Sequence, residues 1–142
     1  MKRYKDEEIK LLIPQREPFV MVDEVEQTGE DSASTALAVR SDNYFMLPDD
    51  TMAETGLIEH IAQSCSALMG CQALSLHLTK PPVGLIGEVK RFECQRRPQA
   101  GEKVCTTIQF GFAFGNVTIA TAESRVNDEP IAKAQLKIFV QQ

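Results

Sequence analysis

The sequence predicts a single α+β domain, residues 1–142, in which a curved antiparallel sheet wraps around one long helix. Two observations support this architecture. Residues 55–70 repeat apolar side chains at helical spacing, and residues 83–140 form strand-like segments separated by turn signals. A chain of this length buries roughly two-thirds of its unfolded surface, so one core is expected.

The long helix is predicted from the stretch TGLIEHIAQSCSALMG, residues 55–70. Its apolar side chains share one broad face of a helical wheel. The adjoining stripe is polar or small: Glu59, Gln63, Ser66 and Gly70. Neither stripe has the long Lys and Arg side chains of a solvated face, so we expect the helix to be covered on both. A Thr51-x-x-Glu54 capping box is expected to open it.

Shorter elements precede the long helix. Residues 5–12 predict a short amphipathic helix that ends before Pro14. Residues 19–25 and 34–39 predict two strands, because both are rich in β-forming side chains and residues 28–32 between them supply a turn.

After the long helix the chain predicts an antiparallel meander. Lys80-Pro81-Pro82 is expected to end the helical region. The predicted strands are residues 83–93, 104–114, 117–126 and 131–140, with turns at Gly115-Asn116 and at residues 127–130. Phe110, Phe112 and Phe114 alternate along one strand, so we expect them to be sheet core packed on the helix.

Composition excludes several functions. The net charge of −5 argues against a nucleic-acid binder. No apolar run approaches the roughly 20 residues of a membrane helix, and the N-terminus lacks the apolar core of a signal peptide, so a cytoplasmic location is expected. The spacing of Cys65, Cys71, Cys94 and Cys105 fits no zinc pattern, so free buried thiols and no metal site are expected.

Three segments resemble the hot-dog-fold 3-hydroxyacyl-acyl-carrier-protein dehydratases. The first, LLIPQREPFVMVDEV at residues 11–25, is similar to the family pattern L-P-H-R-x-P-F-x-x-V-D-x-V. The matching residues are Pro14, Arg16, Pro18, Phe19, Val22, Asp23 and Val25, and Gln15 departs from the pattern. The second, GLIEHIAQ, resembles the family helix V-L-I-x-E-A-M-A-Q, with Glu59, Ala62 and Gln63 in register. The third comprises GEVKRFE and PQAGEKV, which resemble the closing strands.

The resemblance implies a hot-dog fold in which two protomers pair their sheets. The acyl chain then enters a tunnel at the dimer interface, carried on the phosphopantetheine of an acyl carrier protein or of CoA, and no other cofactor is implied. In the family, a histidine of a G-H-F-P-G motif and a helix carboxylate of the partner do the chemistry. Dehydration takes a proton from C2 and protonates the departing C3 hydroxyl, which suits two groups with separated pKa values. Glu59 occupies the carboxylate position.

The motif histidine is missing. Where G-H-F-P-G stands in the family, this chain has Phe45 or Met46 at the histidine, depending on a one-residue deletion, and neither side chain transfers protons. Ala53-Glu54 replaces the family's P-G before the helix, and a charge at Glu54 opposes a developing oxyanion. We therefore expect Glu59 as the catalytic residue and Gln63, Phe45, Met46 and Glu54 as substrate contacts.

His60 is the obvious substitute, but adjacent helical residues point about 100° apart. A hydrogen-bonded or partly exposed structural histidine is expected at 60, and a catalytic role is the alternative. His77 lies beyond the helix, and Asp23 is expected at a turn or strand end. Glu59 also has a structural alternative, a buried acid hydrogen-bonded to Gln63 one turn on.

Three functions follow from these residues. The first is an acyl-thioester dehydratase that uses Glu59, in fatty-acid or polyketide-like synthesis. The second is a catalytically inactive hot-dog subunit that pairs with an active paralogue, and the third is an acyl-thioesterase that uses Glu59. A homodimer, a higher oligomer or a heterodimer is compatible with them. The basic residues Lys90, Arg91, Arg96 and Arg97 form either a solvated turn or a docking surface for a carrier protein or a CoA phosphate.

Overall fold

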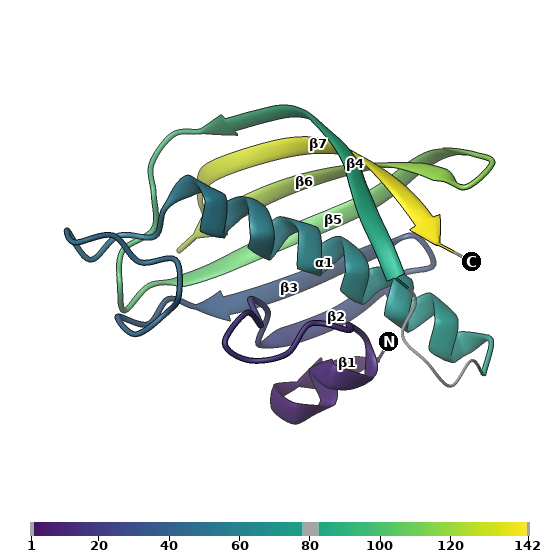
Figure 1. The fold of residues 1–142 in the computed structure, drawn as a ribbon, viewed down its shortest axis with the longest axis horizontal. Coiled ribbons are helices and arrows are strands. Elements are labelled where there is room, and N and C mark those ends of the chain that lie inside the picture. Colours follow the sequence, from purple (N-terminus) through teal and green to yellow (C-terminus); the bar gives the residue numbers. More distant parts are fainter. Residues whose placement is uncertain (1, 78–82, 142) are drawn as a thin grey trace.

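An antiparallel sheet curves around one long helix in the computed structural model, which describes residues 2–77 and 83–141 (Figure 1). Within those residues the sheet has seven strands. The elements are β1 (Arg3–Lys5), the short 3-10 helix η1 (Asp6–Leu11), β2 (Glu24–Gly29), β3 (Ser32–Ala38), α1 (Glu54–Ser75), β4 (Val83–Cys94), β5 (Lys103–Phe114), β6 (Val117–Val126) and β7 (Glu129–Gln141). The α+β prediction is confirmed.

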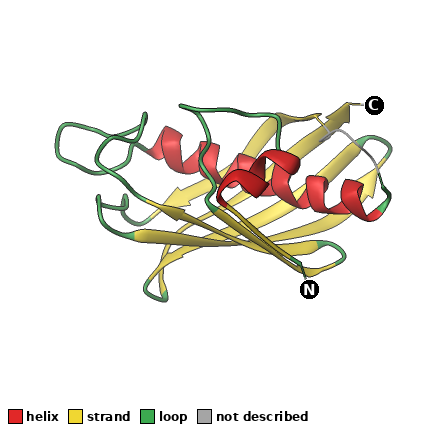
Figure 2. Cartoon of the chain, turned by 90° about the horizontal axis from the view of Figure 1, so that it is seen from below, coloured by secondary structure: helices red, strands yellow, loops and turns green. Residues whose placement is uncertain are grey.

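The strand order is β1-β2-β3-β5-β6-β7-β4. Hairpins join β2 to β3, β5 to β6 and β6 to β7, where the sequence predicts turns. The meander prediction is wrong for β4, which pairs with β7 and forms an edge of the sheet, while β5 pairs with β3. The helix α1 lies along one face of the sheet, and the other face is free of helices in the described chain (Figure 2).

The start of α1 differs from the predicted capping box. Ala53 occupies the N-cap position without a side-chain cap. The Thr51 hydroxyl instead donates to Asp49 Oδ1 at 2.6 Å, so it is unavailable to the first turn of the helix. The helix ends at Ser75 with Leu76 as its C-cap. The predicted stop at Lys80-Pro81-Pro82 lies outside the described residues.

Both stripes of α1 are covered, as predicted. The apolar face packs on the sheet, where Leu57, Ile61 and Leu68 are fully buried. The polar stripe is covered by the segment that follows η1: Gly70 lies directly against the backbone of Leu12, and Gln63 contacts Phe19 and Met21. Small side chains and side-chain amides on this stripe therefore allow a second layer of backbone to approach the helix.

The strand predicted at residues 19–25 begins only at Glu24. Residues 19–23 are irregular although Met21 and Val22 are buried. Their backbone groups bond in part to helix side chains instead of a neighbouring strand, since Gln63 accepts from the Met21 amide and donates to the Phe19 carbonyl.

The phenylalanine stripe is only partly core. Phe110 is buried, but Phe112 is 72% exposed and Phe114 is 75% exposed, so the prediction is wrong for these two. The cause is a bulge: Phe110 pairs with Ala120 and Ala113 pairs with Thr118, which leaves two residues of β5 opposite one of β6. Such a bulge interrupts the in-and-out alternation, and residues 111–114 beyond Phe110 are all exposed.

All four cysteines are free. Cys65 and Cys71 are buried and Cys94 is half-buried, but Cys105 is exposed, so the expectation of buried thiols is wrong there. Cys105 lies on β5 between the buried residues Val104 and Thr106, and therefore points to the opposite face of the sheet. Among the described residues, no helix has the length and apolar character needed to cross a membrane.

The close approach of Leu12 to Gly70 gives a test of this packing. Replacing glycine by alanine inside a helix ordinarily stabilises it, but here the new methyl group would meet the Leu12 backbone. We expect Gly70→Ala to lower the free energy of unfolding by about 1–3 kcal/mol, the usual cost of overpacking. Urea unfolding followed by circular dichroism measures the change.

The Gly111→Ala variant is the matched control. A Cβ at residue 111 would meet nothing closer than the Ile119 carbonyl oxygen at 3.7 Å, an ordinary contact. We expect its free energy of unfolding to stay within about 0.5 kcal/mol of wild type. Stabilisation by Gly70→Ala would show that the N-terminal segment does not press on the helix.

Candidate active site

Glu59 and Gln63 lie on the same side of α1 and are joined by a hydrogen bond. Gln63 Nε2 donates to Glu59 Oε2 at 2.8 Å, which confirms the contact predicted from their spacing of one helical turn. Gln63 is fully buried, whereas Glu59 is half-buried. A carboxylate therefore stands at the boundary between the covered helix and its surroundings, with one oxygen held in place.

The orientation of the Gln63 amide follows from its other partners. The Met21 N–H donates to Gln63 Oε1 at 2.6 Å, so this atom must be the acceptor oxygen. Gln63 Nε2 then donates to the Phe19 carbonyl at 2.6 Å and to Glu59. Both amide protons are used, so Gln63 can satisfy Glu59 in one arrangement only.

Phe45 and Met46 lie before the start of α1, at the positions aligned with the missing histidine. The Ala53 N–H donates to the Phe45 carbonyl at 2.9 Å. The Phe45 side chain packs against Gly56, and a Cβ at residue 56 would overlap it. Met46 forms an isolated bridge with Met52, and both Phe45 and Met46 pack against the core. These two side chains make this part of the site apolar.

An exposed aromatic pair adjoins this loop. Phe19 and Tyr44 meet edge to face with ring centroids 4.8 Å apart, and Tyr44 meets Phe45 in the same way at 5.2 Å. Phe19 is 44% exposed and Tyr44 is 62% exposed. Sequence analysis missed Tyr44 as a member of this cluster, although its position next to Phe45 was the available signal. The aromatic rings extend the apolar surface from the helix start to the Phe19 segment.

Glu54 is exposed in the first turn of α1, where a negative charge is favourable. Glu54 and Glu59 both lie on α1, and no hydrogen bond joins these two residues. Asp23 lies immediately before β2, and its Oδ2 accepts from the N–H of Ala38 at the end of β3 at 2.7 Å. Asp23 therefore makes the strand-end contact expected from the sequence.

His60 points away from Glu59 into the interface between helix and sheet. It is fully buried, with Nδ1 2.7 Å from the Met21 carbonyl and Nε2 2.8 Å from Thr106 Oγ1. Burial lowers the pKa of His60 to about 4, so the imidazole is neutral near pH 7. His77 is exposed beyond the end of α1. Neither histidine of the chain faces the Glu59 carboxyl.

Of the four basic residues considered for docking, Lys90, Arg91, Arg96 and Arg97, the last two form ion pairs within the chain. Arg96 pairs with Glu102 at 2.9 Å and with Glu129 at 3.2 Å. Arg97 pairs with Asp49 at 3.3 Å, which ties the loop before α1 to the segment after β4. Lys90 and Arg91 are exposed on β4 and form no ion pair with any residue that the structure describes.

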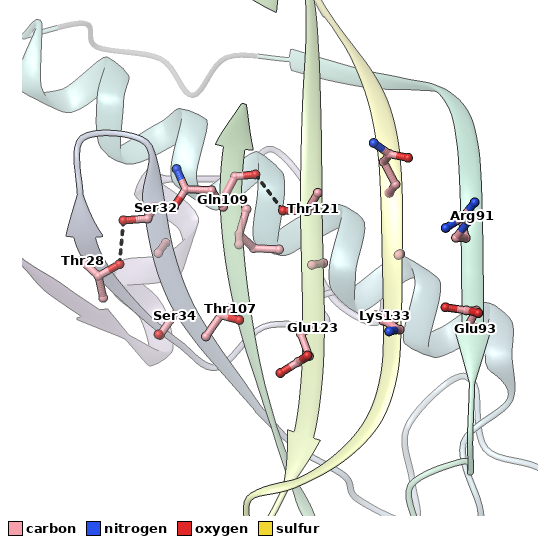
Figure 3. Close-up of a pocket in the computed structure, with 15 residues that line it drawn as sticks. Thr28, Ser32, Ser34, Arg91, Glu93, Thr107, Gln109, Thr121, Glu123 and Lys133 are labelled. Atoms are coloured by element: carbon pink, nitrogen blue, oxygen red, sulfur yellow. Dashed lines mark hydrogen bonds between the residues drawn. The ribbon is translucent and has the colours of Figure 1, made fainter. Parts of the chain in front are cut away.

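A hollow of about 710 Å³ lies on the sheet face opposite α1. Its lining comes from the strands β2 to β7, and Figure 3 shows the polar side chains around it, among them Thr107, Thr121, Glu123 and Lys133. It contains neither Glu59 nor Gln63 and is separated from them by the sheet. The candidate active site is therefore on the helix side of the sheet.

The family of the chain follows from comparison with known proteins. A family model described as ApeP-like, ApeP dehydratase, matches residues 7–142. The chain belongs to this family. It is also 24% identical over 135 residues to the 3-hydroxyacyl-[acyl-carrier-protein] dehydratase FabZ of Clostridioides difficile, and the match covers 92% of each chain. The predicted resemblance to hot-dog dehydratases is confirmed.

Solved structures share the fold. The dehydratase heterocomplex ApeI:P from Xenorhabdus doucetiae contains a chain that matches with a TM-score of 0.87 and 14% identity, covering 94% of this chain and 91% of that one. The E. coli PaaI protein from the phenylacetic acid degradation operon matches with a TM-score of 0.62 and 13% identity, covering 81% and 80%. These likenesses confirm the predicted hot-dog fold.

The lowered pKa of His60 gives a test by pH. Between about pH 4 and the ordinary value of 6.5, the unfolded chain binds a proton at residue 60 that the folded protein does not. Stability is therefore lost as the pH falls through this window, by about 3 kcal/mol in total. Urea unfolding across this pH range should show a shallower decline in the His60→Asn variant, which lacks the titrating group. An equal decline in both proteins would contradict the assignment.

Proposed function

We propose that this chain contributes to dehydration of a 3-hydroxyacyl thioester, with Glu59 as an acid–base group and with the second group supplied by another chain. The observation that carries the proposal is a half-buried carboxylate oriented by Gln63, while both histidines of the chain lie elsewhere. Membership of a dehydratase family supplies the reaction class.

The chemistry requires two proton transfers. One group takes a proton from C2, and the other protonates the C3 hydroxyl as it leaves as water, so that a 2-enoyl thioester forms. A single carboxylate is poorly matched to both steps, since the base and the acid need different protonation states. Glu59 performs one step, and an imidazole from a partner chain that retains the motif histidine performs the other.

The partner is a related hot-dog protein. The edge strands β1 and β4 leave backbone groups open to a second sheet. One solved structure with the same fold is the dehydratase heterocomplex ApeI:P, which supports a pairing of this kind. In the assembled site Gln63, Phe45, Met46 and Glu54 contact or border the substrate, and the exposed Phe19–Tyr44 pair extends the apolar wall.

The acyl group arrives on the phosphopantetheine arm of an acyl carrier protein or of CoA. Of the four basic residues Lys90, Arg91, Arg96 and Arg97, the exposed Lys90 is the cation that we assign to an acidic carrier or a CoA phosphate, because Arg96 and Arg97 are engaged within the chain and Arg91 lines the hollow on the other face of the sheet. Fatty-acid and polyketide-like synthesis both use such thioesters. The chain length of the acyl group follows from the tunnel that the two chains enclose.

Turnover by the assembled complex tests the proposal. The chain is purified alone and with a histidine-bearing hot-dog protein of the same organism, and formation of the enoyl thioester is followed by mass spectrometry. We expect turnover only in the complex, and we expect Glu59→Gln to lower it about 100-fold or more, the usual scale of general acid–base catalysis. Glu30→Gln is the matched control, because Glu30 is an exposed carboxylate in the β2–β3 turn.

Two contrary outcomes identify the two other functions, and a third refutes the need for a partner. Full turnover by the Glu59→Gln complex would make this chain a non-catalytic subunit that supports an active paralogue. Release of free thiol from the acyl thioester, lost in Glu59→Gln, would make it a thioesterase. Equal turnover by the isolated chain would refute the need for a second chain.

A further inference from the structure

A chain of buried hydrogen bonds crosses the protein from β6 to the Phe19–Met21 segment. Ser124 Oγ lies 2.7 Å from Thr106 Oγ1, which lies 2.8 Å from His60 Nε2. His60 Nδ1 lies 2.7 Å from the Met21 carbonyl oxygen. Ser124, Thr106 and His60 are all at most 1% exposed, so water does not compete for these bonds.

The direction of each hydrogen bond in this series, from Ser124 to Met21, is determined. A carbonyl oxygen can only accept, so the proton of the neutral imidazole is on Nδ1. Nε2 is then an acceptor, and the Thr106 hydroxyl donates to it. Since that hydroxyl has no second proton, it accepts from Ser124. His60 therefore has a fixed tautomer and a fixed ring orientation.

Met21 is held at both of its backbone groups. His60 donates to its carbonyl, and its N–H donates to Gln63 Oε1 at 2.6 Å. Gln63 Nε2 in turn donates one hydrogen bond to the Phe19 carbonyl and one to Glu59. The direction in which Gln63 presents an N–H to the Glu59 carboxyl thus depends on where Met21 sits.

We propose that His60 is a positioning residue for Glu59, which acts through Met21 and Gln63 and transfers no proton itself. Its importance for catalysis rests on the proposed role of Glu59, but the linkage between the two residues does not. A histidine suits this place because its rigid ring donates on one side and accepts on the other. Loss of the bond to Met21 lets the segment, the Gln63 amide and the carboxyl adopt several arrangements instead of one.

Two variants divide the histidine into its two bonds. The amide nitrogen of an asparagine takes the place of Nδ1, so His60→Asn keeps the bond to Met21 and loses the one to Thr106. The amide of a glutamine reaches the place of Nε2, so His60→Gln keeps the contact with Thr106 and loses the hydrogen bond to the Met21 carbonyl. In the turnover assay we expect kcat to fall about tenfold or more for His60→Gln and less than about threefold for His60→Asn, with KM nearly unchanged in both, because misplacement by fractions of an ångström is costly to the chemical step.

Thr35→Val is the control for a purely structural role. Thr35 Oγ1 is buried and lies 2.7 Å from Ser64 Oγ, a contact between sheet and helix that does not touch Met21 or Gln63. We expect its Tm to fall while kcat stays at the wild-type value. Equal losses of kcat in His60→Asn and His60→Gln, matched by their losses of Tm, would overturn the proposal.

A second readout does not need activity. In protein labelled with ¹³C at glutamate carboxyls, the Glu59 signal is identified by its absence from Glu59→Gln. We expect this signal to shift in His60→Gln and to stay in place in His60→Asn. If His60→Gln does not fold, His60→Leu replaces it, with the same shift expected. An unmoved Glu59 signal in the variants that lose the hydrogen bond to the Met21 carbonyl would overturn the proposal. If the signal shifts as expected but the complex shows no turnover, only the proposed function is overturned.

Discussion

The rest of the candidate site depends on the hydrogen bonds of the Gln63 side-chain amide. In a helix enclosed by a sheet on one side and by the N-terminal segment on the other, a buried polar group is costly unless it is hydrogen-bonded. Gln63 does so for Met21 and Phe19 and still has one N–H for Glu59. The same amide therefore fixes an irregular backbone segment and orients the carboxyl that we assign to chemistry.

This constraint explains why two neighbouring residues have different roles. Glu59 lies on the stripe that the N-terminal segment covers, at the end where the cover stops, and remains half-buried. His60 lies one helical step away and faces the sheet, where Thr106 and Ser124 complete its hydrogen bonds. An imidazole that is buried, neutral and bonded at both nitrogens cannot replace a histidine opposite Glu59. The loop at Phe45 is apolar, and in the function that we propose another chain supplies the histidine.

Periodicity in the sequence was sufficient to predict most of the architecture. Alternation and turn residues located β5, β6 and β7, and helical spacing located α1, because each of these signals is local. The prediction was wrong where one residue changed the local pattern. The bulge after Phe110 turned Phe112 and Phe114 outward, and Thr51 bonded to Asp49 instead of capping the helix. A sequence pattern does not show which of two nearby partners a hydroxyl will choose.

The sequence by itself determined the family, the enclosing sheet and the candidate carboxylate, since the motifs around Pro14 and Glu59 are contiguous stretches of chain. The spacing of one helical turn also predicted the contact between Glu59 and Gln63, but only the tertiary structure decided the long-range partners of Gln63 and His60. Met21 and Thr106 are far from α1 in the sequence, and the folding of the N-terminal segment and β5 onto the helix brings Met21 within hydrogen-bond distance of Gln63 and Thr106 within hydrogen-bond distance of His60. The tautomer of His60 and the orientation of Gln63 follow from those contacts, because buried donors and acceptors must be paired and only one arrangement pairs them all.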